Sequence, residues 1–267
     1  MDIQNKVFVV TGAGNGIARE VALRLLAAGA SVAGVDLSEQ GLLETATIAG
    51  AGERFSLHVV DITDRAAVEA LPAAVADIHG QVDGIVNIAG VIQKFVKVID
   101  LPFSEIEKVM NVNFWGVMNM CKAFLPILVT RPAAAIVNVA SMGSYAPVPG
   151  QAVYGASKAA VKLLTEALFA ELRDTNVAVT VVFPGAIATA IAANSGVSLG
   201  TEGAAGETSA YKTTSPQKAA EVIVDAIRRG RFRATIGADA AAMDKLSRLN
   251  PKMATTMIAK QMSGLLT

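Results

Sequence analysis

Residues 6–18 read K-V-F-V-V-T-G-A-G-N-G-I-A, and this stretch decides the fold. The β-rich run Lys6 to Val10 predicts a short strand, and the glycines after it predict a tight turn into a helix that continues to Ala28. A second apolar run, Ser31 to Val35, predicts another strand, which ends at Asp36. This order of strand, glycine turn, helix, strand and acid is the pattern of a dinucleotide-binding unit.

Each part of this unit has a chemical reason. Glycines let the backbone approach a pyrophosphate closely, and the start of the helix offers unpaired N–H groups to the anion. Asp36 stands twenty residues after Gly16 and can accept hydrogen bonds from both hydroxyls of an adenosine ribose. An ordinary tight turn remains the alternative for the glycine pattern taken alone.

The alternation of strand and helix continues along the chain. Further strands are predicted at residues 54–60, 82–88, 135–140, 177–183 and 233–236, and further helices at 66–78, 104–128, 154–172 and 216–228. The expected fold class is therefore α/β: a doubly wound, mostly parallel, seven-stranded Rossmann sheet with helices on both faces. We expect one Rossmann-type domain over residues 1–267, in which residues 238–267 form a helical C-terminal extension.

Composition excludes several classes of protein. The chain has 267 residues, 52% of them hydrophobic and 17% charged, so it can bury a large core without disulfides. Its 23 basic and 23 acidic residues balance, and nothing favours nucleic acid as a partner. Cys121 is the one cysteine, which fits a reducing compartment. Met1 to Lys6 shows no signal-peptide pattern, so we expect a cytoplasmic protein without membrane contact.

A second informative stretch, Ser141 to Lys158, reads S-M-G-S-Y-A-P-V-P-G-Q-A-V-Y-G-A-S-K. Tyr154 and Lys158 are four residues apart, so they share one face of the predicted helix. An ammonium near a phenol favours the phenolate and lowers its pKa, which then suits proton transfer with a substrate oxygen. Ser141 follows an apolar run and could hydrogen-bond the same oxygen. Taken alone, the pair also fits a surface tyrosine and a solvated lysine.

All these features together resemble the short-chain dehydrogenase/reductase family. The resemblance covers about Lys6 to Gly237 and departs from the family pattern at Ala18, where a third glycine is usual. The motifs that carry it are T-G-A-G-N-G-I-A (residues 11–18), Asp36, Asp61, N-I-A-G (87–90), Asn113, Ser141, Tyr154, Lys158 and P-G-A-I-A-T (184–189).

The resemblance implies a catalytic set and a cofactor site. Tyr154 would be the general acid/base, Lys158 would lower its pKa, Ser141 would position the substrate oxygen, and Asn113 would hold a water in a proton relay. The implied cofactor is bound by Gly12, Asn15, Gly16, Ile17, Asp36, Leu37, Asp61, Ile62, Asn87, Ala89, Gly90, Tyr154, Lys158, Pro184, Gly185, Ile187 and Thr189. A structural cap or turn remains the alternative for Asn87, Asn113 and Thr189.

Asp36 also predicts which nicotinamide cofactor is used. Its carboxylate would repel the 2′-phosphate of NADP. Asn15 and Leu37 carry no compensating positive charge, and Arg19, one helical turn in, is expected to face solvent or a neighbouring acid. We therefore expect NAD.

The expected substrate is a hydrophobic small-molecule secondary alcohol or its ketone, interconverted by hydride transfer. The loops above the strand ends supply apolar candidates for its pocket, although several of them could face the core: Val91, Ile92, Met142, Val148 and Val197. The small-residue-rich stretch Ala190 to Thr214 has the composition of a closing lid.

Two other functions stay open at this point. One is a catalytically silent, dinucleotide-binding regulatory protein, against which the intact catalytic set argues. The other is a hydrolase that uses Ser141, but the chain has no G-x-S-x-G motif, and neither His58 nor His79 has an evident orienting acid. These two histidines and Cys121 show no metal-site spacing, so we expect no metal.

The resemblance and the C-terminal residues also predict how the chain assembles. In the family, the helices matching Asn113–Phe124 and Tyr154–Leu172 pair between subunits, which implies a homo-oligomer, commonly a tetramer. Apolar residues recur at helical spacing near the C-terminus, and Asn250-Pro251 would begin a second short helix there. We expect these helices to dock on protein, with a membrane surface as the alternative. Their apolar residues include Met243, Leu246, Leu249, Met253, Met257, Ile258, Met262, Leu265 and Leu266.

Overall fold

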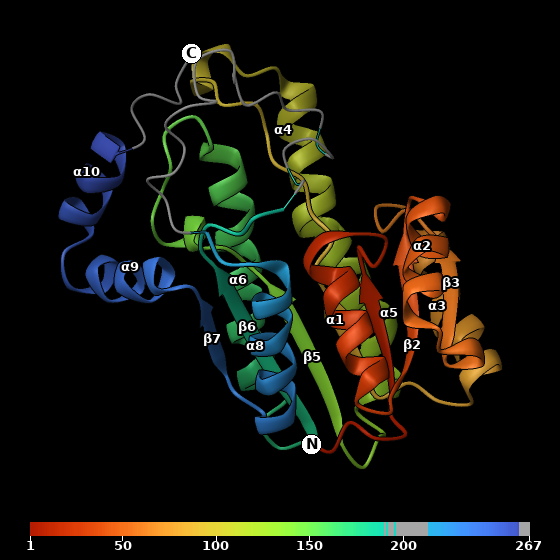
Figure 1. Ribbon diagram of the computed structural model, residues 1–267. Coiled ribbons are helices and arrows are strands. Elements are labelled where there is room, and N and C mark those ends of the chain that lie inside the picture. Colours follow the sequence, from red (N-terminus) through yellow and green to blue (C-terminus); the bar gives the residue numbers. More distant parts are fainter. Residues whose placement is uncertain (190, 192–194, 196–212, 262–267) are drawn as a thin grey trace.

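A parallel sheet forms the centre of the computed structural model, which describes residues 1–189, 191, 195 and 213–261 (Figure 1). Within these residues the sheet has seven strands in the order β3-β2-β1-β4-β5-β6-β7, and every pairing is parallel. The predicted fold class is confirmed. The strands are β1 (Val7–Thr11), β2 (Ser31–Asp36), β3 (Phe55–Val59), β4 (Gly84–Asn87), β5 (Ala134–Val139), β6 (Val177–Pro184) and β7 (Arg233–Ile236).

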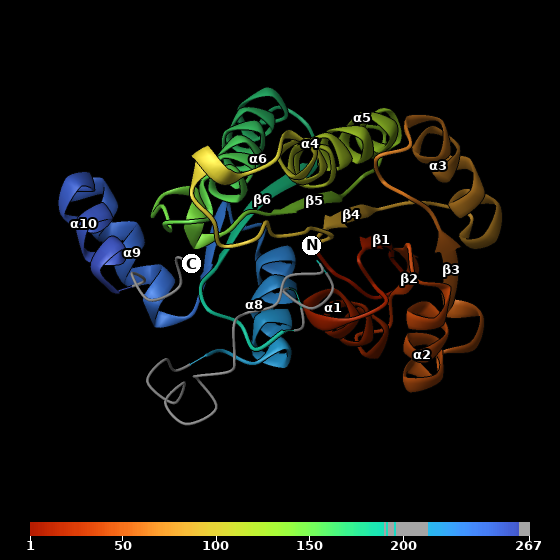
Figure 2. The same cartoon turned by 90° about the horizontal axis from the view of Figure 1, so that it is seen from above.

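Helices cover both faces of the sheet, as the view from above shows (Figure 2). One face carries α1 (Gly16–Ala27), α2 (Glu39–Ala49) and α8 (Pro216–Arg229). The other face carries α3 (Arg65–His79), α4 (Phe103–Met110), α5 (Val117–Leu128) and α6 (Ala152–Glu171).

Alternation along the central strand β1 separates two apolar cores. Phe8 and Val10 point to the face of α1 and α8, whereas Val7 and Val9 point to the face of α3 and α5. Because both faces are buried, strands such as β5 are apolar at nearly every position instead of alternating with polar residues.

The strand order reverses between β1 and β4. The chain builds β1, β2 and β3 outward in one direction and then returns to place β4 on the other side of β1. Connections leave the carboxyl ends of β1 and β4 toward opposite faces, and this leaves a crevice at that edge of the sheet. The motif residues that follow the strands therefore meet there.

Two local features differ from the sequence prediction. Helix α2 was not predicted, although Ser38 caps it by accepting a hydrogen bond from Gly41 N–H. The helix predicted over 104–128 is continuous but is not uniform, because Asn111–Gly116 forms a π-helical turn between α4 and α5. Such turns are commonly found at functional sites, and this one contains Asn113.

Two helices follow β7, as expected for the C-terminal extension: α9 (Ala238–Leu249) and α10 (Pro251–Gln261). Asn250 lies between them, and its Oδ1 accepts a hydrogen bond from Met253 N–H. The helices bury Ala240, Ala254 and Ile258, whereas Leu249, Met253 and Met257 are exposed, so no described residue covers this part of the predicted apolar stripe. Met262, Leu265 and Leu266 lie outside the described residues.

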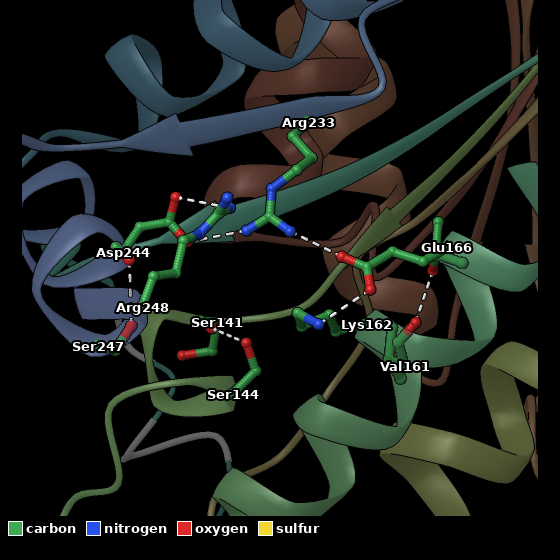
Figure 3. A network of polar contacts seen from close by, with 10 residues as sticks. Ser141, Ser144, Val161, Lys162, Glu166, Arg233, Asp244, Ser247 and Arg248 are labelled. Carbon is green, nitrogen blue, oxygen red and sulfur yellow. Dashed lines mark hydrogen bonds and ion pairs between the residues drawn. The ribbon is translucent and has the colours of Figure 1, made fainter. Parts of the chain in front are cut away.

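A chain of ion pairs joins α9 to the body of the protein (Figure 3). Arg233 on β7 bonds Glu166 of α6 at 2.7 Å and Asp244 of α9 at 2.9 Å. Lys162 and Arg248 extend the chain by pairing with the same two acids. Because both acids are largely shielded from solvent, these pairs are screened less than ordinary surface pairs. The extension therefore docks on protein through α9.

Candidate active site

A cleft of about 430 Å³ opens at the carboxyl edge of the sheet. Its volume lies in the usual range for a ligand pocket. Of the residues predicted to bind cofactor or to act in catalysis, those that line it are Gly12, Asn15, Gly16, Ile17, Asp36, Leu37, Asp61, Ile62, Ala89, Gly90, Ser141, Tyr154, Lys158, Pro184, Gly185, Ile187 and Thr189.

The glycine turn forms one wall of the cleft, between β1 and α1. Gly12 has a φ of +80°, and a Cβ built on it would lie 3.2 Å from the backbone of Ala89. Gly16, the first residue of α1, has a φ of +56°. Side chains would strain the turn at both positions, whereas glycine leaves the backbone and the helix N-terminus accessible to an anion. This arrangement fits a dinucleotide pyrophosphate.

Asp36 is held rigidly at the end of β2. Its Oδ2 accepts a hydrogen bond from Gly14 N–H at 2.9 Å, and its Oδ1 accepts one from Ser38 N–H at 2.9 Å. A Cβ on Gly14 would lie 2.9 Å from Oδ2, so only glycine fits against the carboxylate at this point. The two amides fix the orientation of the carboxylate, and Leu37 beside it is exposed on the cleft.

Asp61 and Ile62, which follow β3, line the cleft next to the end of β2. Asp61 Oδ1 accepts a hydrogen bond from Thr63 N–H at 2.8 Å, and Asn119 of α5 donates to the Ile62 carbonyl. The Ile62 side chain lies over Gly116, where a Cβ would approach it to 2.5 Å. Leu37 and Ile62 both give this end of the cleft apolar surface, which suits a flat ring.

Ser141, Tyr154 and Lys158 lie together on the cleft wall that β5 and α6 form. Ser141 Oγ accepts a hydrogen bond from Gly143 N–H at 3.0 Å, which orients the hydroxyl. Lys158 Nζ donates to the Val139 carbonyl at 3.0 Å, and its side chain is almost completely buried. Burial lowers the pKa of Lys158 to about 8.

The pKa of Tyr154 differs from the sequence expectation. Burial raises it above the usual value for a phenol, and the hydrogen bond with Ser141 lowers it less than burial raises it. In the protein alone, desolvation therefore outweighs the effect expected from Lys158. Forming the phenolate needs further positive charge, which an oxidised nicotinamide would supply when bound.

Asn87 and Asn113 lie behind the cleft wall and do not line it. Asn113 Nδ2 donates to the Val91 carbonyl and to Ser157 Oγ, and its Oδ1 accepts from Val91 N–H. Asn87 donates to Asn138 at 2.8 Å. Both asparagines are buried and connect backbone segments of the site, so the water-holding role of Asn113 stays a prediction.

Hydrogen bonds to β7 and α9 hold the segment Pro184 to Thr189 against the cleft. Gly185 N–H donates to the Ile236 carbonyl of β7, and Ala186 N–H donates to Asp239 Oδ2 of α9 at 2.8 Å. The sequence did not single out Asp239. The sequence did not single out Gln93 either, although its side chain bonds the start of α6. In both cases the partner lies far away along the chain, and no local pattern indicates it.

Few of the apolar residues expected around the substrate line the cleft. Val91 does, and Ile191 joins it, but Ile92, Met142 and Val148 are not among the lining residues. Val197 and most of the predicted lid, Ala190 to Thr214, lie outside the described residues.

Other chemistries find less support. His58 and His79 both bond Ser56 Oγ through Nε2, at 2.9 and 2.8 Å, near the edge strand β3, and neither contacts Ser141. In the part of the chain that the structure describes, no group of acids, histidines and cysteine could hold a metal ion. No helix among these residues is long and apolar enough to span a bilayer.

Comparison with known proteins also points to a dinucleotide-dependent oxidoreductase. The family model for short chain dehydrogenases matches residues 6–198. The protein of Mycobacterium tuberculosis named "Putative oxidoreductase SadH" is 38% identical over 255 residues, which is 92% of this chain and 91% of that protein. The chain belongs to the short-chain dehydrogenase family. This dehydrogenase is therefore an oxidoreductase that acts on CH–OH groups.

Solved structures agree with this assignment. A short-chain dehydrogenase/reductase from Burkholderia phymatum, crystallised with NAD, superposes with a TM-score of 0.84 at 26% identity. The match covers 95% of the present chain and 96% of the Burkholderia chain. Levodione reductase superposes with a TM-score of 0.81 at 28% identity, and the match covers 90% of the present chain and 99% of the levodione reductase chain.

Proposed function

We propose that this dehydrogenase uses NAD to interconvert a hydrophobic secondary alcohol and its ketone. The observation that carries the proposal is that Ser141, Tyr154 and Lys158 line the same cleft as the glycine turn and Asp36. One cleft would thus serve both the proton transfer that we propose and the binding of a dinucleotide. A silent binding protein would not need a half-buried phenol and a buried lysine beside the ligand.

The residues present fit NAD. The turn at Gly12 and Gly16 leaves space for a pyrophosphate, and Asp36 is fixed by two amides so that its carboxylate can accept from ribose hydroxyls. Lys158 would reach the second ribose, and Pro184 to Thr189 would hold the carboxamide. The similar dehydrogenase from Burkholderia phymatum was crystallised with NAD, which supports the same cofactor here.

In alcohol oxidation, the bound cofactor supplies a hydride acceptor. Ser141 Oγ would hydrogen-bond the substrate hydroxyl and hold it beside Tyr154. The Tyr154 phenolate would take the hydroxyl proton as the C–H bond breaks. Lys158, four residues on along the same helix face, would stabilise the phenolate. In ketone reduction, Tyr154 would return the proton.

The apolar substrate class rests on the lining of the cleft. Val91, Ile187 and Ile191 contribute apolar side chains to it. Its acidic residues, Asp36 and Asp61, belong to the ends of β2 and β3, where adenosine is expected. Apart from Lys158, the basic lining residue among those described is Lys108, so neither a carboxylate nor a phosphate meets a cluster of cations.

A panel of secondary alcohols of increasing size, supplied with NAD and followed by the absorbance of reduced nicotinamide, tests the proposal. We expect kcat/KM to rise as apolar groups are added next to the hydroxyl, and expect the matching ketones to be reduced. NAD binding without turnover of any alcohol or ketone would contradict the proposal and favour the silent regulatory protein.

A further inference from the structure

Gln93 is completely buried, and both polar atoms of its side chain form hydrogen bonds at the start of helix α6. Its Oε1 accepts hydrogen bonds from Val153 N–H at 2.9 Å and from Tyr154 N–H at 3.0 Å. Its Nε2 donates to the Gly150 carbonyl at 3.0 Å. Gln93 belongs to the loop after β4, about sixty residues away in sequence, and one of the amides that it holds is that of the proposed acid/base.

Helix α6 has no cap of its own. The first amides of any helix lack partners within the helix, and a nearby side chain usually accepts from them. Gln151 occupies the N-cap position of α6 but makes no capping hydrogen bond. Its Nε2 donates instead to the Gln93 carbonyl at 2.6 Å. The missing cap is thus supplied by Gln93 from a different segment.

The same loop is fixed at each neighbouring residue. Val91, which lines the cleft, is bonded through both N–H and C=O to Asn113. Ile92 N–H donates to Ser195 Oγ at 3.0 Å. Consecutive residues therefore connect the cleft wall to the π-helical turn, to the segment after β6 and to the start of α6. Gln93 is the member of this series that holds Tyr154.

We propose that Gln93 is a positioning residue for the oxidoreductase reaction: it caps α6 from outside the helix and so fixes the Tyr154 phenol relative to Ser141 and the cleft wall. The inference rests on the proposed function of Tyr154. It follows from geometry, because the held amide and the phenol belong to one residue. A small displacement of a reacting group can cost about 10²-fold in rate.

The test compares Gln93→Met, which keeps the length but loses every hydrogen bond of the side chain, with Gln93→Glu, which keeps an acceptor for the two amides. For Gln93→Met we expect amide hydrogen exchange at Val153 and Tyr154 to accelerate at least about tenfold, and kcat on the best alcohol of the panel to fall about 10–100-fold. The Kd for NAD, measured by calorimetry, should change by less than about threefold, because the lost bonds hold the first turn of α6, whereas Lys158, one turn further on, keeps its own hydrogen bond to the Val139 carbonyl. Gln93→Glu should recover slow exchange and most of kcat.

A matched control removes a cap from another helix. Asp64 Oδ1 accepts from Ala66 and Ala67 N–H at the start of α3, which carries no residue of the cleft. Asp64→Ala should accelerate exchange at those amides and leave kcat nearly unchanged. Unchanged exchange at Val153 and Tyr154 in Gln93→Met, or faster exchange with an unchanged kcat, would overturn the proposal. If the wild-type protein turns over no alcohol, the proposed function fails, and the exchange rates still decide whether Gln93 holds α6.

Discussion

Arg19 on α1 forms an ion pair with Glu44 on α2, with its guanidinium 2.9 Å from the carboxylate. Arg19 also donates to Thr45 Oγ1 at 3.0 Å and to the carbonyl of Gly14 in the glycine turn. The hydrogen bond from Arg19 is the main reason why the pKa of Glu44 lies below its usual value. The cation nearest in sequence to the glycine turn is thus engaged by a neighbouring acid, which is one of the two alternatives that the sequence left open.

This pair leads to a prediction about cofactor choice. Asp36 would face the 2′-phosphate of NADP, and each pair of like charges at 4 Å costs roughly 4 kcal/mol at an effective dielectric near 20, before screening. With Arg19 held by Glu44, no nearby cation among the described residues of the cleft offsets this cost. We expect kcat/KM for NAD to exceed that for NADP by at least about 100-fold, a difference of ~2.7 kcal/mol. Equal use of both cofactors would contradict the prediction.

Releasing Arg19 should shift this preference. In an Asp36→Asn background, Glu44→Gln removes the charge that holds the guanidinium, so Arg19 becomes available to a 2′-phosphate. We expect the double variant to use NADP better than Asp36→Asn alone. Asp174→Asn removes an exposed acid elsewhere, in the chain segment after α6, and serves as the control. If the double variant and Asp36→Asn have the same NADP efficiency, Arg19 does not contribute.

Tyr154→Phe should remove the proton carrier and keep the ring. A positioned acid/base typically contributes about 10²–10⁴-fold to the rate, so we expect a loss of that order in kcat with NAD binding retained. Tyr145→Phe is the matched control, because Tyr145 donates to the Ala240 carbonyl and does not line the cleft. The Tyr145→Phe variant should keep most of the wild-type kcat. Normal turnover by Tyr154→Phe would refute the mechanism.

Lys158 predicts a particular dependence of stability on pH. Its pKa is about 8 in the folded protein, whereas the ordinary pKa of a lysine, which applies to the unfolded chain, is 10.5. Below about pH 8 both the folded and the unfolded protein carry the proton, and the cost of burying the ammonium is fully present. Between these two pKa values the folded protein has released a proton that the unfolded chain keeps, so the contribution of Lys158 to stability rises with pH.

Urea unfolding of wild type and Lys158→Met at several pH values measures this contribution, because the other titrating groups cancel in the difference. The free energy of unfolding of wild type minus variant should become more positive from about pH 7 to about pH 10. Lys122→Met, at an exposed position on α5, controls for the loss of a lysine. A difference that stays flat over this range would show that Lys158 is not desolvated.

Much of this site could be predicted because its residues lie close in sequence to the strands that position them. The glycine turn follows β1 directly, and Asp36, Asp61 and Ser141 each stand where a strand ends. Parallel strands bring their carboxyl ends to one edge, so these residues meet whatever the details of packing. The spacing of Tyr154 and Lys158 places them on one helix face for the same local reason.

What could not be predicted depends on partners far apart in sequence. Gln93 bonds α6, and Asp239 bonds Ala186, but neither position has a local pattern that names its partner. The spacing by which the helix over 104–128 was predicted does not distinguish a π-helical turn at Asn111–Gly116 from an α-helical one. The raised pKa of Tyr154 results from burial, which spacing alone does not reveal.

Exposed apolar residues on α6 and in the π-helical turn lead us to predict that the chain forms an oligomer. Leu163 and Phe169 on α6 and Trp115 in the π-helical turn are exposed in the single chain. We propose that they are covered by other subunits in a homotetramer, so light scattering should give four times the 27.5 kDa of one chain. Leu163→Lys should reduce that mass. Leu43→Lys, at an exposed leucine of α2, should not, and a monomeric wild type at micromolar concentration would refute the prediction.

The last prediction concerns Asp239, through which the C-terminal extension contacts the cleft. Its carboxylate lies over two glycines, where a Cβ on Gly185 or on Gly237 would approach it to 2.2 Å, and it accepts from Ala186 N–H. Asp239 thereby supports the segment that is proposed to hold the nicotinamide carboxamide. Asp239→Ala should weaken NAD binding about tenfold, because the released segment would have to be ordered when the cofactor binds, and Asp239→Asn should recover much of the affinity.

Asp244, five residues further along α9, gives the contrast that separates binding from stability. It bonds Arg233 and Arg248 and does not line the cleft, so Asp244→Ala should lower Tm and leave the Kd for NAD nearly unchanged. Asp239→Ala should do the reverse, because the lost contact supports a cleft segment more than it supports the docking of α9. Calorimetric titration with NAD and thermal unfolding of both variants measure the two effects. If the two variants lose stability and NAD affinity in the same proportion, α9 acts only as a structural support and Asp239 has no separate part in the site.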